Sequence, residues 1–395
     1  MKPELKLPAR LQAIVDADYP RFSRGELERR RGLMAKAMAE ARVDHLVAYG
    51  GFFRGGPVHW LSDWMPTFEA VLVFTPGRRD ALFIQFYNHM PQAEALMSRD
   101  AEVRWGGPMT APTVIAELEA RGVKANRLGF VGGLPVGFYK ALGAKFGEVA
   151  DLNRAYGGLR LVKSAEEIDW YRIAARLSDL PIEALAREMR AGMDERDLAA
   201  IIEASYTPWR AQNIIHFLGT TSMHRPEIFV PRQHTLTRKI AKGDVVFTEI
   251  TASFWEHWGQ VLRTFSIGEP LTPLYRKLHD AADAAYEAIF KAIKPGGHVR
   301  DLLVGRKVIE DAGLTYYDDI VHGFGGGYLQ PILGSPTRGE EPVPDMTLQV
   351  GMMMVIQPNV ITPDFKAGMQ TGELVVVTET GAESLHTAPP GPIEV

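Results

Sequence analysis

The stretch GDVVFTEITASFWEHWGQVLRTFSIG, residues 243–268, holds two long segments rich in β-branched and aromatic residues. This composition is typical of strands, and the tryptophan and histidine residues at 255–258 are expected near the tip of a strand pair. Glu249 lies inside the first segment between apolar and threonine residues, where burying a carboxylate is costly unless it is paired or contacts a ligand. The stretch therefore predicts a long strand pair that carries a residue of the functional site.

Helices are predicted before and after this strand pair. Ser164 and Glu167 have the spacing of a capping box, so a long helix is expected from about 165 to 190, and another at 193–205. Strands close the chain in MMMVIQPNVI and TGELVVVTETGAESL. This order indicates helices packed on a mostly antiparallel sheet, which is an α+β fold and not an array of parallel βαβ units.

The N-terminal part predicts a second, smaller domain. Residues 44–50, 68–76 and 79–86 are expected to form strands, the last two joined as a hairpin, and a helix is predicted after Ser23. A chain of 395 residues is longer than the ~250–300 residues at which a single core stops growing. We therefore predict an α/β domain at residues 1–158 and a second domain at residues 159–395.

Composition excludes several classes of function. The 44 basic and 48 acidic residues give a net charge of -4, which argues against nucleic acid as a partner. The chain has no cysteine, so disulfides, thiolate nucleophiles and thiolate metal sites are excluded. No apolar run of about 20 residues and no signal peptide are found, so we expect a soluble, cytoplasmic protein without a membrane partner.

One histidine stands before a run of glycines in VHGFGGGYLQP, residues 321–331. A phosphate-binding loop needs a helix that begins at the glycines, and this run ends at Gln330 and Pro331 instead. The glycines more plausibly allow backbone to approach a bound molecule closely. His322 is therefore a candidate for the functional site.

Six motifs in order resemble the pita-bread family, which includes methionine aminopeptidase, aminopeptidase P, prolidase and creatinase. The motifs are LRLVKSAEEIDWYRIA, KGDVVFTEI, GQVLRTFSIGEP, HGFG, MVIQP and LVVVTETGAESL, which together cover roughly residues 160 to 390. The resemblance implies a C-terminal domain in which helices cover an antiparallel sheet. It also implies a homodimer, and likens residues 1–155 to the smaller domain of the aminopeptidase P and creatinase branch.

The metalloenzymes of that family hold two metal ions with two aspartates, one histidine and two glutamates. Carried over position by position, these ligands fall on Glu249, Gln260, His322, Gln357 and Gly372. Two divalent cations need several anionic oxygens around them, and neutral glutamine is a poor replacement. Unless Glu373 turns inward, the resemblance therefore implies at most one weak ion, and we expect no metal and no other cofactor.

Creatinase is the member of the family that works without a metal, with a histidine base in the loop before the glycine-aspartate pair. Counting back from Gly243 places Arg232 at that position, with His234 two residues later and His224 in the same loop. Arginine is a poor base because its pKa stays above ~12, whereas a histidine titrates near neutral pH. Because Arg232 is cationic and acids are depleted, a neutral or carboxylate-bearing substrate is expected.

The sequence thus predicts a metal-independent, creatinase-like hydrolase that cleaves a C–N bond of a small polar molecule. His234 or His322 would be the general base, and Glu249 would orient or protonate the leaving group. The residues predicted to bind substrate are Arg232, Gln260, Gln357, Tyr328 and His224. Three alternatives stay open, namely a metal-free lyase, an unusual metallopeptidase of the Xaa-Pro type and a non-catalytic binding protein.

Overall fold

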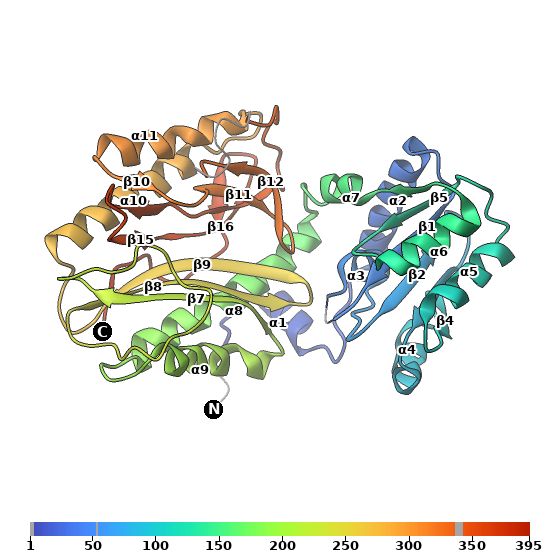
Figure 1. The fold of residues 1–395 in the computed structure, drawn as a ribbon, viewed down its shortest axis with the longest axis horizontal. Helices are drawn as coiled ribbons and strands as arrows, with labels where there is room; N and C mark the ends of the chain where they lie inside the picture. Colours follow the sequence, from blue (N-terminus) through green and yellow to red (C-terminus); the bar gives the residue numbers. More distant parts are fainter. Residues whose placement is uncertain (1–3, 53, 336–342) are drawn as a thin grey trace. The chain divides into compact units, whose positions relative to one another are not determined.

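The computed structural model describes residues 4–52, 54–335 and 343–395, and the chain divides into two compact units (Figure 1). The smaller unit is Arg21–Arg160, and the larger unit contains Leu161–Val395 together with the segment that ends at Pro20. That segment includes α1 (Ala9–Asp16), and Arg176 donates to the carbonyl oxygen of Leu5 at 2.7 Å. Residues 4–20 therefore pack with the larger unit, whereas the sequence analysis placed them in the N-terminal domain.

The smaller unit is a mixed sheet with helices, as expected for an α/β domain. Its strand order is β4-β3-β2-β1-β5-β6, and β2 and β3 pair antiparallel as the predicted hairpin does. The strands are β1 (His45–Gly50), β2 (Ala70–Phe74), β3 (Asp80–Ile84), β4 (Ala101–Trp105), β5 (Leu128–Val131) and β6 (Val149–Asp151). The helices are α2 (Arg24–Glu40), α3 (Gly56–Ser62), η1 (Tyr87–His89), α4 (Met90–Met97), α5 (Thr110–Ala120), α6 (Val136–Phe146) and α7 (Asn153–Leu159).

The larger unit is built on a curved sheet whose main path is β12-β11-β13-β16-β9-β8-β7, with neighbours antiparallel along that path. Its longest strands are β7 (Gln212–Ser222), β8 (Asp244–Phe254) and β9 (His257–Ser266). The shorter ones are β11 (Val321–Phe324), β12 (Tyr328–Leu333), β13 (Met353–Ile356), β16 (Gly372–Val377), β17 (Ala382–Ser384) and β18 (Ile393–Glu394). A small second sheet joins β10 (Thr315–Tyr316), β14 (Asn359–Ile361) and β15 (Gly368–Gln370).

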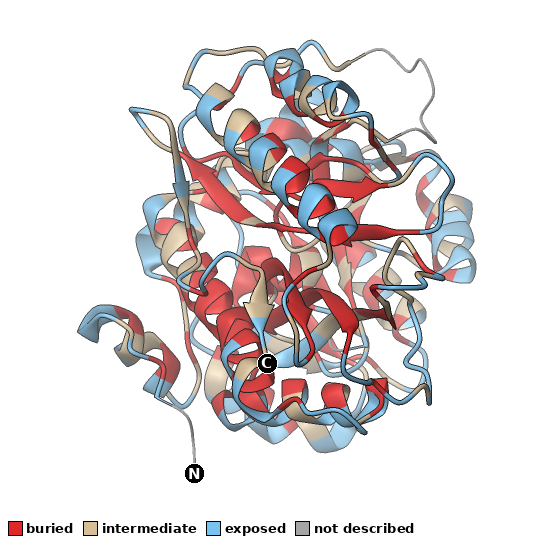
Figure 2. Ribbon diagram, turned by 90° about the vertical axis from the view of Figure 1, so that its left-hand side faces the viewer, coloured by how far each residue is buried: buried red, intermediate tan, exposed pale blue. Residues whose placement is uncertain are grey.

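Helices lie on two sides of this sheet, as Figure 1 shows for α8 and α9 below β7–β9 and for α10 and α11 at the other end. They are α8 (Ala165–Glu188), α9 (Glu195–Tyr206), η2 (Thr207–Trp209), α10 (Pro273–Ala292), η3 (Val299–Leu303) and α11 (Val304–Asp311). Figure 2 shows buried and exposed residues alternating along the helices, because one face of each packs on the sheet. The α+β class predicted from the sequence is confirmed.

The predicted start of α8 is confirmed in detail. The amide of Glu167 donates to the Ser164 hydroxyl at 3.1 Å, and the Ser164 amide donates to the Glu167 carboxylate at 2.9 Å. This capping box satisfies two of the backbone donors that a helix N-terminus leaves free.

Among the helices of the described chain, none is long and apolar enough to cross a membrane.

Close approach of α8 to β9 depends on Gly259. A Cβ atom at this position would lie 2.4 Å from the backbone of Ala174 and Ala175. At this short separation the Ser178 hydroxyl of α8 donates to the Gly259 carbonyl oxygen and accepts from the Ala252 amide at 2.9 Å. The position of α8 against the sheet is therefore fixed by the missing side chain of one glycine.

Gly259→Ala should lower the free energy of unfolding by roughly 1–3 kcal/mol, because the new methyl group forces α8 away from the strand. Urea denaturation followed by circular dichroism measures the effect. The matched control is Gly143→Ala inside α6, where a Cβ atom meets nothing within 4 Å and the same change should leave stability unchanged or raise it. Equal stability of the Gly259→Ala variant and the parent protein would contradict the packing argument.

Candidate active site

His322 lies on β11, and its side chain is completely buried. Its Nε2 atom is 3.2 Å from Oε1 of Gln357, and its Nδ1 atom is 3.2 Å from the carbonyl oxygen of Gly323. The ring of Tyr328 stacks on the imidazole with 3.8 Å between centroids and an interplanar angle of 14°. Both ring nitrogens and one face of His322 are thus held in place by neighbours.

The chain of hydrogen bonds continues from Gln357 to the strand pair β8–β9. Nε2 of Gln260 donates to Oε1 of Gln357 at 3.0 Å and to Oε1 of Glu249 at 2.8 Å. These four side chains come from both halves of the sheet and are buried, with at most 6% of any residue exposed. We call Glu249, Gln260, His322 and Gln357 the inner cluster. All four were predicted as site residues from the sequence, and they lie together in the structure.

Two consecutive aspartates that the sequence analysis overlooked adjoin the inner cluster. Nε2 of Gln357 lies 3.3 Å from both the carbonyl oxygen and Oδ2 of Asp319. Asp318 is close enough to act electrostatically on Glu249 and on His322. The acidic pair stands only three residues before His322, and this spacing is the signal that would have identified it.

Burial controls the protonation of the inner cluster. Burial first, and then the negative charge of Asp318, raise the pKa of Glu249 to about 8, although a hydrogen bond from Gln370 opposes the rise. Burial and Asp318 likewise raise the pKa of Asp319 to about 9. Burial lowers the pKa of His322 to about 4. Near neutral pH the cluster therefore holds a proton on Glu249 and an uncharged imidazole at His322.

The residues present do not fit the two-metal centre of the family that the sequence resembles. Two of the five ligand positions are glutamines, and the fifth is Gly372, whose φ of 151° and close approach to Ile356 leave no room for a side chain. Within the part of the chain that the structure describes, no group of three or more histidine, aspartate or glutamate side chains is placed to hold a metal ion. These side chains therefore do not suit a pair of divalent metal ions.

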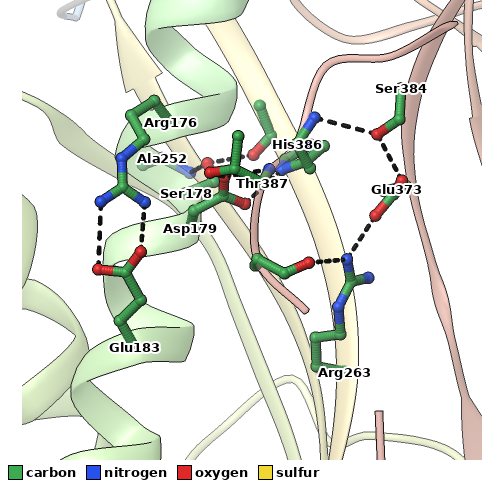
Figure 3. A network of polar contacts seen from close by, with 12 residues as sticks. Arg176, Ser178, Asp179, Glu183, Ala252, Arg263, Glu373, Ser384, His386 and Thr387 are labelled. Carbon is green, nitrogen blue, oxygen red and sulfur yellow. Dashed lines mark hydrogen bonds and ion pairs between the residues drawn. The ribbon is translucent and has the colours of Figure 1, made fainter. Parts of the chain in front are cut away.

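Glu373 does not turn inward to replace the missing ligand. Its carboxylate pairs with Arg263 and accepts from the hydroxyl of Ser384 (Figure 3). It also accepts from the hydroxyl of Tyr286 at 3.0 Å. Arg263 is buried and also donates to the Gly372 carbonyl oxygen at 2.8 Å. The charge of Glu373 is thus neutralised within a separate network, so it cannot help to hold a cation beside His322.

Three of the predicted site residues lie in the loop between β7 and β8. His224 is exposed, and its Nε2 atom pairs with Glu269 at 2.6 Å. His234 is exposed, and the backbone amide of Arg232 donates to the carbonyl oxygen of Leu218 at 2.9 Å. In the described ranges no hydrogen bond joins any of these three side chains to the inner cluster, whereas Tyr328 contacts it directly through His322.

Comparisons with known proteins point to peptidases. A model of metallopeptidase family M24 matches residues 169–379. The Xaa-Pro dipeptidase of Pyrococcus furiosus is 26% identical over 228 residues, which are 58% of this chain and 63% of that protein. The chain thus aligns with about six tenths of that relative's length. Among solved structures, dipeptidase PepE from Mycobacterium ulcerans has a TM-score of 0.76 at 23% identity and covers 95% of this chain and 100% of its own.

A second solved structure agrees in fold. The Xaa-Pro dipeptidase from Bacillus anthracis has a TM-score of 0.79 at 19% identity, with 93% of this chain and 100% of that chain covered.

The prediction of a metal-independent, creatinase-like hydrolase of a small polar molecule is wrong, because the relatives are dipeptidases within a family of metallopeptidases. The prediction followed from the changed ligands and from the comparison with creatinase, and the changed ligands show what the site lacks and not which molecules it binds.

The raised pKa of Glu249 predicts a pH-dependent difference between the protein and its Glu249→Gln variant. The pKa of Glu249 is 4.5 in its ordinary state and about 8 in the folded protein. Between these pH values the folded protein keeps a proton that the unfolded chain loses, so the free energy of unfolding falls as pH rises. The variant lacks this titration. Its free energy of unfolding, relative to that of the parent protein, should therefore rise from pH 5 to 9, by at most ~1.4 kcal/mol per pH unit. Urea unfolding at one-unit steps measures it, and a pH-independent difference would contradict the buried proton.

Proposed function

This chain belongs to metallopeptidase family M24, and on that premise we propose that it hydrolyses the peptide C–N bond of short peptides of the Xaa-Pro type. The observation that supports this proposal is the inner cluster, which occupies the site positions of the family and keeps a buried histidine and a buried carboxyl group there. The match of the family model across residues 169–379 and the dipeptidase relatives agree with it.

In this proposal the inner cluster binds and protonates the peptide. Glu249 carries a proton near neutral pH and would donate it to the leaving nitrogen as the C–N bond breaks. A water molecule would attack the carbonyl carbon, and the Glu249 carboxylate would then take up the proton that this water loses. His322 is held uncharged and fixed by Gln357 and Tyr328, so that its position relative to the substrate is constant. Tyr328 is half exposed and offers one face of the site to the substrate. A homodimer stays a prediction, which light scattering during gel filtration checks.

A peptide-binding protein without turnover is the second candidate. The observation that favours it is the change at the ligand positions, where Gln260, Gln357 and Gly372 stand in place of acids. Gly372 is the strongest of these, because its backbone conformation and the carbonyl oxygen of Ile356 exclude a larger residue. In this case the inner cluster would recognise a peptide, and no product would form.

Release of proline from dipeptides such as Ala-Pro and Leu-Pro tests the proposed activity. Product is measured by chromatography in chelator-treated buffer and with added manganese or zinc, while plasma mass spectrometry gives the metal content of the same preparations. We expect proline release, and we expect Glu249→Gln to lower kcat/KM by roughly 100-fold or more, because a positioned proton donor is lost.

The matched control is Glu379→Gln, the same change at an exposed residue after β16, which should leave kcat/KM unchanged. Binding of the dipeptides, measured by calorimetry, separates the two candidates. Dipeptides that bind and are never cleaved under any metal condition would establish the binding protein. Dipeptides that neither bind nor react would overturn both candidates.

A further inference from the structure

A second pocket of the larger unit, with a volume of about 460 Å³, lies beside the Glu373 side chain. It is lined by the Arg263–Glu373 ion pair, by one face of α10 and by residues 386–390. None of the four residues of the inner cluster lines it. This volume is in the range of sites for small organic molecules, so the pocket is a candidate for a binding site separate from the inner cluster.

A buried histidine lines this pocket and is held from behind by an aspartate. The side chain of His386 is completely buried, and its Nδ1 atom lies 2.7 Å from Oδ1 of Asp179 on α8 (Figure 3). Oδ2 of Asp179 accepts from the amide and the hydroxyl of Thr387 at 2.7 and 2.9 Å. Burial opposes ionisation, but His386 and Thr387 outweigh it and lower the pKa of Asp179. Because an ionised carboxylate can only accept, Nδ1 of His386 carries a hydrogen.

The other ring nitrogen of His386 is left without a partner. Nε2 is buried and forms no hydrogen bond with any residue that the structure describes. Nδ1 is turned toward α8, which does not line the pocket, so Nε2 lies on the side of the ring away from that helix. With the hydrogen fixed on Nδ1, the lone pair of Nε2 can accept a hydrogen bond. A buried acceptor without a donor costs ~1–3 kcal/mol, so this nitrogen indicates a ligand that brings a donor.

The charges that line the pocket favour a positively charged ligand. Arg263 spends its donors on Glu373 and on four backbone carbonyl oxygens, so its guanidinium group is fully engaged. Asp283 and Glu287 add two carboxylates from α10. Glu287 pairs with Lys291 at 3.1 Å, whereas no lysine or arginine forms an ion pair with Asp283 in the described part of the chain. The charge of Asp283 therefore remains to be balanced by a cation.

Two aromatic rings of α10 give the pocket an apolar side. Tyr286 and Phe290 both line it, and their rings stack with 5.9 Å between centroids and an interplanar angle of 25°. The Tyr286 hydroxyl donates to Glu373 at 3.0 Å, which fixes the position of its ring. Pro389 and Pro390 complete the apolar lining. Aromatic faces attract cations and also pack on hydrocarbon, so a ligand with a charged end and an apolar body suits this lining.

We propose that this pocket binds a small organic ammonium ion, whose N–H group donates to Nε2 of His386 while Asp283 balances its charge. The apolar body of the ligand would pack on Tyr286 and Phe290. A metal ion is a poorer match, because no group of three or more histidine, aspartate or glutamate side chains among the described residues is placed to hold one. The inference does not rest on the proposed peptidase activity, since the pocket shares no residue with the inner cluster.

Titration calorimetry of the whole protein with phenethylamine, phenethyl alcohol and phenylpropionate tests the site, because these probes share one aromatic body and differ in charge. We expect phenethylamine to bind roughly tenfold more tightly than the alcohol, and phenylpropionate not to bind. His386→Asn keeps a nitrogen that can donate to Asp179 but lacks Nε2. It should weaken phenethylamine binding by roughly tenfold, because a hydrogen bond to a charged donor is lost.

Asp283→Asn removes the charge on α10 without changing the size of the side chain, and it should weaken phenethylamine binding by about threefold. The matched control is Asp280→Asn, the same change at an exposed residue of α10 that does not line the pocket, and it should bind like the parent protein. Circular dichroism checks that each variant is folded. Asp283→Asn decides the question by itself where His386→Asn does not fold.

Absence of saturable phenethylamine binding to the parent protein would overturn the inference, as would phenylpropionate binding of equal strength. An equal loss of affinity in Asp280→Asn and Asp283→Asn would also contradict it, because the pocket would then not be the site. Loss of binding in Glu249→Gln with no change in His386→Asn would place the amine in the inner cluster and overturn the inference. Amine binding at His386 without any proline release leaves the inference standing and removes only the peptidase proposal.

Discussion

A carboxyl group and an imidazole cannot stay buried in a sheet unless polar neighbours satisfy them, and the larger unit is organised around this constraint. Glu249 lies on β8 and His322 on β11, which belong to different halves of the sheet. Gln260 connects them by donating from Nε2 to both Glu249 and Gln357, and Oε1 of Gln357 accepts from Gln260 and lies 3.2 Å from Nε2 of His322. A glutamine suits this position because it extends a hydrogen-bond chain without adding charge, so the two halves are joined by polar contacts inside an otherwise apolar core.

The strand register divides the acids between two faces of the sheet. Arg263 lies three residues after Gln260 and pairs with Glu373 on the other face, where Ser384 also donates to Glu373 (Figure 3). Tyr286 donates to the same carboxylate. Since alternate residues of a strand point to opposite faces, the acid next to Gly372 serves a structural ion pair while the neighbouring position carries no side chain. Because neighbouring residues of β16 point to opposite faces, the position on the same face as the inner cluster is Gly372, which offers no anionic ligand.

Much of the fold could be predicted from the sequence, because local signals agreed with the final packing. The Ser164–Glu167 capping box and the β-branched segments of 243–268 formed as expected, and Glu249, Gln260, His322 and Gln357 met in one place. Asp319 could have been found from its spacing before His322, but the places of Asn359 and Gln370 could not be predicted, because these residues lie on β14 and β15 of the second sheet. Which residues face Glu249 depends on how two sheets approach each other, and no local pattern of sequence records that approach.

The peptidase relatives and the altered ligand positions describe different properties of the same site. The overall fold is shared with dipeptidases of known structure. The identity of residues 260, 357 and 370 determines what charge the cluster can neutralise, and carboxamides offer oxygens without negative charge. Two divalent ions would leave several positive charges unbalanced at positions that hold one glutamate and two glutamines. The glutamines and Gly372 therefore determine how much charge the site can balance, while the shared fold determines that these positions lie together.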